Sequence, residues 1–340
     1  MRHIMKEKTF FLVLLISISL LAASCGADTL ISEETAPYPA APADSAASVP
    51  TQSGPAACEE MIFAYSFHSR SGAGSNIIAI CPDGSDPRQV TRDGQNMSPS
   101  WSPDRSQIAY LSYRSGSLQL HIVDKDGSND RQLTSGSDFN AWRAIWLPDG
   151  NRIALSGHDQ QWQTVNVLTG EITPLDEWEF PGYGVSLSHD GTRVAYTVRT
   201  DPYDADSPAE IYVQDIDGSN PYQLTETGWF IHSPTWSPDD SQIAFLSSSE
   251  YGPGQNAIYT INLDGRDLHE PILTNLHPYR IAWSPDGKSL AVIAGEMVPT
   301  GELNTPELML KTLYVLNIKL GEKRELFKAL APDDITNLSW

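Results

Sequence analysis

The sequence Trp283-Ser284-Pro285-Asp286-Gly287 belongs to a motif that recurs along most of the chain. The other copies are Trp101-Ser-Pro-Asp, Trp146-Leu-Pro-Asp-Gly, Leu187-Ser-His-Asp-Gly and Trp236-Ser-Pro-Asp, and the chain ends in the same register at Leu338-Ser339-Trp340. Successive copies lie about 40 to 60 residues apart, a spacing typical of one supersecondary unit repeated in an array. The motif therefore predicts a repeat protein.

Each copy leads into short apolar runs rich in β-branched residues. The first runs are Ile108–Ser112, Ile153–Ser156, Val194–Thr197, Ile243–Ser247 and Leu290–Ala294. The second runs, which commonly end in Asp-Gly, are Leu118–Val123, Ile211–Asp215, Ile258–Asn262 and Leu313–Asn317. A brief closing run is seen at Arg131–Thr134 and Tyr222–Thr225. With the segment that carries the motif, each unit is predicted to hold four short strands.

The turns between these runs have a physical basis. Glycine accepts positive φ, proline presets the first turn residue, and aspartate bonds back to nearby backbone amides. Four short strands in a unit of about 45 residues predict an all-β fold, the β-propeller. On these residues, positions 59–340 resemble the TolB-like propeller repeats. The resemblance implies the fold and is much less specific for an activity, because this family has many roles.

The two ends of the repeat region predict the number of blades. The first unit has runs at Ile62–Ser66, Ile77–Cys81 and Arg88–Thr91 but no motif-bearing strand, whereas Ile335–Trp340 supplies such a strand and nothing after it. We therefore expect six four-stranded blades, with the C-terminal strand joining the first blade and closing the ring so that no sheet edge is left open. The rival interpretation, a chain that stops within a seventh blade, leaves the first blade without an inner strand.

The first 24 residues are predicted to be a signal peptide. Arg2, Lys6 and Lys8 precede the apolar run Phe10–Leu21, which is too short to span a bilayer comfortably. The sequence Leu21-Ala-Ala-Ser-Cys25-Gly resembles the bacterial lipobox, and this resemblance implies lipidation of Cys25. The alternative is an ordinary cleaved signal with a spare cysteine. Lipidation would anchor an exported protein to the cell membrane or outer membrane of a bacterial envelope.

Residues 25–58 are predicted to be the lipidated cysteine and a disordered tether, because positions 28–58 are rich in Ala, Pro, Ser and Thr without a hydrophobic period. The alternative is a disordered N-terminus without a role. Residues 59–340 then form the propeller. After Cys25 only Cys58 and Cys81 remain, and an exported protein meets an oxidising compartment. We expect a disulfide between them, the alternative being two thiols too far apart to bond.

Composition excludes several classes of partner. The 340 residues include 43 acidic and 22 basic side chains, a net charge of −21 that repels nucleic acid and anionic lipid headgroups. A hydrophobic content of 40% with nine Trp can supply a core.

The sequence contains no Gly-x-Ser-x-Gly, His-Glu-x-x-His or phosphate-loop motif, so no catalysis and no cofactor are predicted. We expect a monomer.

Loop lengths select one face of the propeller for binding. The predicted long connections all fall on the face opposite the Pro-Asp-Gly turns, and binding residues concentrate on long loops held by a rigid scaffold. These connections are Phe67–Ser75, Pro174–Gly182, Arg199–Ala209, Ser249–Asn256 and Gly295–Met309. The aspartates of the motif itself (Asp104, Asp149, Asp190, Asp239 and Asp286) are expected to be structural, because each falls in a repeated turn.

Alignment of the repeats predicts the residues around the channel on the long-loop face. Four positions before each motif stand Met97, Trp142, Tyr183, His232, Tyr279 and Thr336. The next positions hold Ser98, Arg143, Gly184, Ser233, Arg280 and Asn337, and Trp178, Trp229, Phe230 and His277 lie just upstream. Aromatic residues with two arginines suit a protein segment, a peptide or a glycan. The alternative is that the aromatic side chains pack between blades and fill the channel.

These observations predict a membrane-anchored, exported propeller that binds an envelope or extracellular protein. Within the family that the repeats resemble, TolB is periplasmic and binds the peptidoglycan-associated lipoprotein through its propeller, but it also has a separate N-terminal domain for which this chain has only a tether. The alternative function is binding or metal-assisted degradation of a glycan, as in the similar oligogalacturonate lyases, with His68, His158, His232 and His277 on the binding face. A third alternative is a structural module without a ligand.

Overall fold

The computed structural model describes residues 58–69, 72–92, 94–136, 141–157, 162–175, 183–201, 204, 207–248, 257–266, 268, 277–298, 308–329 and 334–340. The predicted signal peptide, the lipidation site Cys25 and the tether up to residue 57 lie outside them. All described residues belong to one compact unit, Ser48–Trp340. Within these ranges the elements are strands alone, and no helix there has the length and hydropathy to cross a membrane. The predicted all-β class is confirmed.

Four of the sheets contain four strands each. The first joins the two ends of the described chain in the order β23 (Asp334–Ser339), β1 (Met61–Ser69), β2 (Gly72–Ile80) and β3 (Arg88–Gln89). The second is β4 (Asn96–Trp101), β5 (Gln107–Ser112), β6 (Gln119–Asp124) and β7 (Arg131–Gln132). The third is β8 (Ala141–Trp146), β9 (Arg152–Gly157), β10 (Trp162–Asn166) and β11 (Ile172–Pro174). The fourth is β19 (His277–Trp283), β20 (Ser289–Val298), β21 (Leu308–Asn317) and β22 (Lys323–Lys328).

The remaining sheet contains two repeat units. One unit is β12 (Tyr183–Leu187), β13 (Arg193–Arg199), β14 (Ala209–Asp215) and β15 (Tyr222–Gln223), and the other is β16 (Phe230–Trp236), β17 (Gln242–Ser248) and β18 (Ala257–Asn262). A single parallel pair, Ala209 with Phe230, links β14 to β16. Within each unit the strands run antiparallel, as the short turns of the sequence require.

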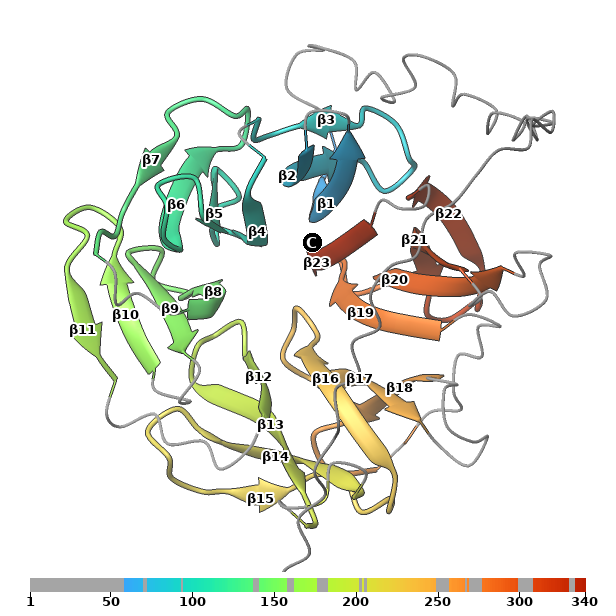
Figure 1. The fold of residues 1–340 in the computed structure, drawn as a ribbon. Helices are drawn as coiled ribbons and strands as arrows, with labels where there is room; N and C mark the ends of the chain where they lie inside the picture. The colour runs from blue at the N-terminus through green and yellow to red at the C-terminus, as the bar shows by residue number, and fades with distance from the viewer. Residues whose placement is uncertain are drawn as a thin grey trace, which may run out of the picture. The chain divides into compact units, whose positions relative to one another are not determined.

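The motif-bearing strands β4, β8, β12, β16, β19 and β23 face a common centre in Figure 1, and we call them the inner strands. Strand β23 lies beside both β19 and β4, and β4 lies beside β8. On the other side, β16 lies beside both β12 and β19. A hydrogen bond from Arg143 Nη1 to the Val185 carbonyl (2.8 Å) connects β8 with β12.

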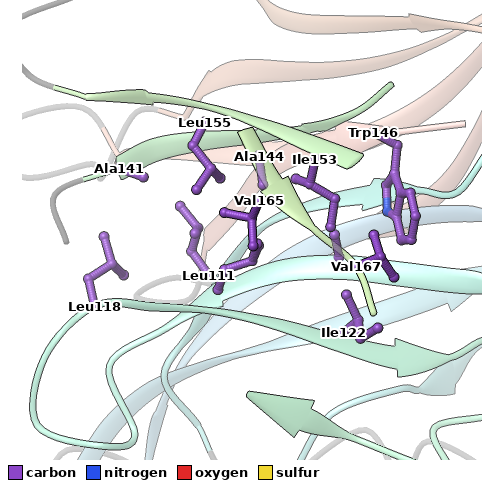
Figure 2. Packing of buried hydrophobic residues seen from close by; sticks show 12 residues of the cluster. Leu111, Leu118, Ile122, Ala141, Ala144, Trp146, Ile153, Leu155, Val165 and Val167 are labelled. Atoms are coloured by element: carbon purple, nitrogen blue, oxygen red, sulfur yellow. The ribbon is translucent and has the colours of Figure 1, made fainter. Parts of the chain in front are cut away.

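Hydrophobic packing occurs between successive sheets. Figure 2 shows the cluster between the second and third sheets, where side chains of β5 and β6 such as Leu111 and Ile122 meet Ile153 and Val165 of β9 and β10. A corresponding cluster joins the fourth sheet to the first, with Ile293 among residues that pack with Met61 and Phe63. Burial of these apolar surfaces is the main stabilising contribution, because removing apolar area from water is the dominant favourable term in folding.

Two of the predicted long loops are wrong in part. Phe67–Ser75 is mostly strand, because β1 and β2 remain paired as far as Ser69 with Gly72. Gly295–Met309 is likewise shortened, because β20 and β21 pair as far as Val298 with Leu308. Ladder hydrogen bonds come from the backbone and continue through polar and glycine residues, which the apolar runs of the sequence did not register. The predicted loop Ser249–Asn256 lies outside the described residues.

The repeated aspartates have the structural role that the turn positions predict. In the turn after β16, Asp239 Oδ1 accepts hydrogen bonds from Ser237 Oγ (2.7 Å) and from the Ser241 amide (3.1 Å). These bonds, with that of Ser237 the largest contribution, lower the pKa of the Asp239 carboxyl. The turns at Asp104, Asp190 and Asp286 repeat the serine contact. Each aspartate thus closes its own turn instead of pointing to a ligand.

Cys58 and Cys81 form a disulfide, with a Cα–Cα distance of 5.8 Å. It joins Cys58, which lies just upstream of β1, to the residue after β2, at the end of the first sheet where Met61 pairs with Ile80. Elsewhere a short turn joins an inner strand to the next strand, whereas β23 and β1 are far apart in the sequence. Trp340 Nε1 also donates to the Glu59 carbonyl (2.9 Å) at this place. The Trp340 bond thus links β23 to the segment that enters β1, and the disulfide closes the open end of the β1–β2 hairpin.

Candidate functional site

The inner strands share a structural irregularity near the second of the two aligned positions described above. In chain order, this position is occupied by Ser98, Arg143, Gly184, Ser233, Arg280 and Asn337. In all six, the pairing with the neighbouring strand shifts register there, which is the mark of a β-bulge. In four strands the residue at this position has positive φ: Ser98 (53°), Gly184 (66°), Ser233 (55°) and Asn337 (49°). In the other two strands the position is occupied by Arg143 and Arg280, which are not among the positive-φ residues.

These six positions line one cavity with a volume of about 580 Å³. The predicted set Ser98, Arg143, Gly184, Ser233, Arg280 and Asn337 is thus brought together by the structure. A bulge directs successive side chains away from the regular alternation of a strand, so this irregularity decides which residues enter the cavity. The volume lies within the range of about 300 to 1,000 Å³ typical of ligand sites.

Charge in the cavity is of one sign. Among the described residues of its lining, Arg143 and Arg280 are the charged ones, and none is an aspartate or glutamate. Arg280 Nη1 donates to the carbonyl of its neighbour Tyr279 (2.8 Å), as Arg143 does to Val185. Neither guanidinium forms an ion pair with a carboxylate of the described residues. The cavity is therefore cationic inside a protein with a net charge of −21.

The surroundings of Arg143 disfavour its charge. Partial desolvation by the surrounding protein lowers the pKa of the guanidinium, although the residue keeps exposed surface. Repulsion from the charge of Arg280 lowers the pKa further. Since arginine is the most basic side chain in proteins, the group remains a cation at neutral pH. The two positive charges thus act on each other across the cavity.

Tyr183 is the aromatic residue of the predicted set that lines the cavity. The Arg199 guanidinium lies over its ring at 4.9 Å from the centroid, a cation–π geometry. Its hydroxyl is buried and has no hydrogen-bond partner among the described residues. Trp142 lies on β8 next to Arg143, but its side chain is outside the described residues, as are Trp178 and the side chain of His68.

The other predicted aromatic residues do not line the cavity. Trp229 packs into the core, with its ring 5.1 Å from that of Tyr259, so packing describes it better than binding. Phe230 and His232 pack against each other, with centroids 5.9 Å apart. His277 and Tyr279 are half-buried at the start of β19, and neither belongs to the cavity lining, which begins on this strand at Arg280. Phe230 and His232 lie near the start of β16, and His277 and Tyr279 lie near the start of β19.

The cavity also contains residues that the repeat alignment missed. Ser156 and Trp162, which pair across β9 and β10, extend the lining between the third sheet and β12. The third unit has no clear second apolar run, so the sequence does not locate its third strand or point to Trp162. Pro99 and Pro234 also line the cavity, and each directly follows one of the aligned serines, Ser98 and Ser233. The shared proline at the next position of the repeat was the signal that could have identified them.

No cluster of three or more metal-ligating side chains occurs in the described ranges. Of the histidines considered for a metal site, His158 lies outside these ranges, and His232 and His277 do not contribute to the cavity lining. The His232 ring nitrogen Nδ1 lies 3.1 Å from Ser233 Oγ. The described histidines are therefore not brought together.

Comparison with known proteins identifies relatives of this fold. No protein-family model matches the chain. A TolB homolog of Chlorobium chlorochromatii is 28% identical over 146 residues, 42% of this chain and 31% of the relative. The Tol-Pal system protein TolB of Desulfosudis oleivorans is 34% identical over 104 residues, 30% of this chain and 23% of the relative. The chain thus matches less than a third of the length of either relative.

Solved structures extend the likeness to most of the chain. The crystal structure of TolB from Acinetobacter baumannii superposes with a TM-score of 0.62 at 18% identity, covering 83% of this chain and 66% of that one. Enzymes share the architecture as well: an oligogalacturonate lyase from Vibrio parahaemolyticus has a TM-score of 0.50 at 16% identity, covering 80% and 87%. Likeness at such identities concerns the fold and not the activity. The sequence relatives and the shared fold together identify this chain as a TolB-like β-propeller.

Proposed function

We propose that this chain is an exported envelope protein that binds another protein at the mouth of its central cavity and catalyses no reaction. The observation that carries the proposal is the cavity itself, in which equivalent positions of six inner strands, at or next to their bulges, converge and include two arginines. Concave sites with a few convergent polar groups are where proteins bind ligands. Likeness to proteins named for the Tol-Pal system supports a protein partner in the envelope.

The architecture behind this proposal is a six-bladed propeller closed by the C-terminal strand. Pairing of β23 with β1 supports closure, since Ile62 pairs with Ser339 and Tyr65 with Ile335. The hydrophobic cluster between the fourth and first sheets supports it independently. A closed ring holds the inner strands at fixed distances from one another, which gives the cavity a constant shape and lowers the entropic cost of binding.

The location of the protein rests on its first 58 residues. The basic start, the apolar run and the lipobox-like Cys25 support export and lipid anchoring, with residues 25–58 as a tether to the membrane. Incorporation of labelled palmitate into the full-length chain, and its loss in Cys25→Ser, tests the anchor. A Cys25→Ser chain that retains the label contradicts lipidation at this residue.

Capture from solubilised cell envelopes tests the binding function. We define the mouth by the first residues of β16 and β19, Phe230 and His277, which lie outside the cavity lining. The full-length, affinity-tagged chain is compared with a mouth variant, Phe230→Ala with His277→Ala, and with a turn variant, Leu168→Ser with Leu320→Ser. Leu168 and Leu320 are 82% and 67% exposed in turns between outer strands, so the turn variant is a matched surface control. We expect one protein to be retained by the wild type and the turn variant, and to fall at least tenfold with the mouth variant.

Equal capture by all three proteins contradicts binding at the mouth. Capture of nothing by three folded proteins contradicts a protein partner altogether. Thermal unfolding measured on each variant separates loss of binding from loss of structure.

A further inference from the structure

The two cavity arginines are placed on opposite sides of the ring of inner strands. Arg143 belongs to β8 and Arg280 to β19. Around the centre in Figure 1, β12 and β16 separate these strands on one side, and β4 and β23 separate them on the other. Both side chains nevertheless line the same cavity. A ligand in its centre is therefore within reach of a guanidinium from each side.

Most donor groups of these arginines are available to a ligand. A guanidinium carries five N–H donors in a fork that matches a carboxylate. Among described residues, Arg143 uses one donor on the Val185 carbonyl and Arg280 uses one on the Tyr279 carbonyl. Of the other arginines, Arg88 pairs with Glu60 and Arg114 with Asp130, whereas Arg131 donates to the Val167 carbonyl. The described lining of the cavity supplies no acid to either of its arginines.

A bound anion would relieve an unfavourable arrangement. The two guanidinium groups repel each other, and Arg143 is in addition desolvated by the surrounding protein. An anion between them replaces repulsion by two attractions in a partly desolvated site, where charge-assisted hydrogen bonds are strong. The net charge of −21 disfavours polyanions at long range, so a ligand with a single negative group fits better than a nucleic acid or a polyphosphate.

The remaining lining suits a chain of small groups. Ser98, Ser233 and Asn337 contribute neutral polar side chains, and Gly184 contributes no side chain. At Gly184 an added Cβ would lie 3.2 Å from Thr197 Oγ1 and 3.4 Å from Pro234 Cδ, and its φ of 66° also favours glycine. Four of the six aligned positions carry shorter side chains, so the two long arginine side chains bound the remaining space of the cavity.

We infer that Arg143 and Arg280 form a carboxylate-binding site in the central cavity, and that the carboxylate belongs to an acidic residue of the bound polypeptide. The choice of a polypeptide rests on the function proposed above. The carboxylate site itself rests only on the cavity, the two arginines and the acid-free lining.

Binding of short peptides to the purified full-length chain tests this inference. The probes are acetyl-Ala-Asp-Ala amide and its neutral counterpart acetyl-Ala-Asn-Ala amide, with galacturonate and inorganic phosphate as further probes, followed by NMR titration. We expect the Asp peptide to bind at least tenfold more tightly than the Asn peptide. We expect Arg143→Gln with Arg280→Gln to remove this preference, and Arg266→Gln, an exposed turn arginine, to leave it unchanged.

Equal binding of the Asp and Asn peptides to the wild type overturns the inference, even if the double variant fails to fold. An Asp preference that survives in a folded double variant overturns it as well. Galacturonate or phosphate that binds with the same arginine dependence, while the Asp peptide does not bind, overturns the polypeptide assignment. If the arginine double variant retains the same partner as the wild type in the envelope capture, this site is contradicted and the proposed function is not. If the wild type captures nothing, the proposed function is contradicted, and the peptide titration alone decides whether the carboxylate site exists.

Discussion

The two ends of the inner strands follow different rules. At the turn end, the motif repeats with little change, and each aspartate bonds to serine or backbone groups of its own turn. At the cavity end, the equivalent position is Ser98, Arg143, Gly184, Ser233, Arg280 or Asn337. A position with the same structural task in every unit needs the same residue, whereas a position that faces a cavity is released from that requirement. The variation therefore marks the cavity end.

The largest expected effect concerns Glu210, a buried carboxylate at the cavity end. It accepts hydrogen bonds from Thr225 Oγ1 (2.6 Å) and from the amides of Thr227 (2.8 Å) and Gly228 (2.6 Å), and so holds the connection that enters β16. Glu210→Ala leaves these donors without an acceptor and is expected to lower the free energy of unfolding by about 3 kcal/mol. Urea unfolding measures this, with the exposed Glu171→Ala as control. A loss below about 1 kcal/mol would mean that the cavity end does not depend on this network.

The next effect concerns the disulfide at the turn end of the first sheet. Cys58→Ser with Cys81→Ser removes a crosslink between residues 23 positions apart and is expected to cost about 3 kcal/mol. A reducing agent should lower the Tm of the wild type and leave that of the double variant unchanged. If reduction has no effect on the wild type, the pairing of β23 with β1 and the Trp340 bond suffice to hold this sheet.

A smaller effect compares two tryptophans of the motif. Trp236 Nε1 donates to the Ser186 carbonyl (3.0 Å) of the neighbouring inner strand, whereas the buried Trp146 Nε1 has no acceptor among the described residues. Replacement by Phe removes similar apolar surface from both, but only Trp236→Phe loses a hydrogen bond and strands a carbonyl. We expect Trp236→Phe to cost about 1 kcal/mol more than Trp146→Phe in chemical unfolding. Equal losses would show that the bond between sheets contributes nothing.

The smallest effect is a pH dependence at the turn end. The pKa of Asp239 is lowered mainly by the Ser237 hydroxyl, so this contact stabilises the fold above the ordinary carboxyl pKa and is lost as the pH falls through the folded value. Since Asp239 is exposed, the part of the Ser237→Ala loss that depends on its charge should be below about 1 kcal/mol at pH 7. The difference in unfolding free energy between wild type and variant should narrow toward pH 3. A difference that widens in acid would contradict this account.

Repeat alignment predicted the cavity set because the repeat imposes one register on all inner strands. Counting back from the motif placed Arg143 and Arg280 at the same depth, and both line the cavity. The same counting failed for Trp229, because a loop residue beyond the strand is free to turn into the core and pack on Tyr259. It also failed for Trp162, whose strand lacks the apolar run that marks its equivalents.

The sequence by itself determined the all-β class, the repeated unit, the structural role of the turn aspartates and the two arginines that distinguish the cavity. All four follow from residue type and spacing, which act over a few positions of the chain. Only the tertiary structure decided that the strands around Ser69 and Val298 extend beyond their apolar runs, and that no acid among the described residues lies beside Arg143 and Arg280 in the cavity lining. These features depend on contacts between residues far apart in the sequence, where spacing carries no information about which groups meet.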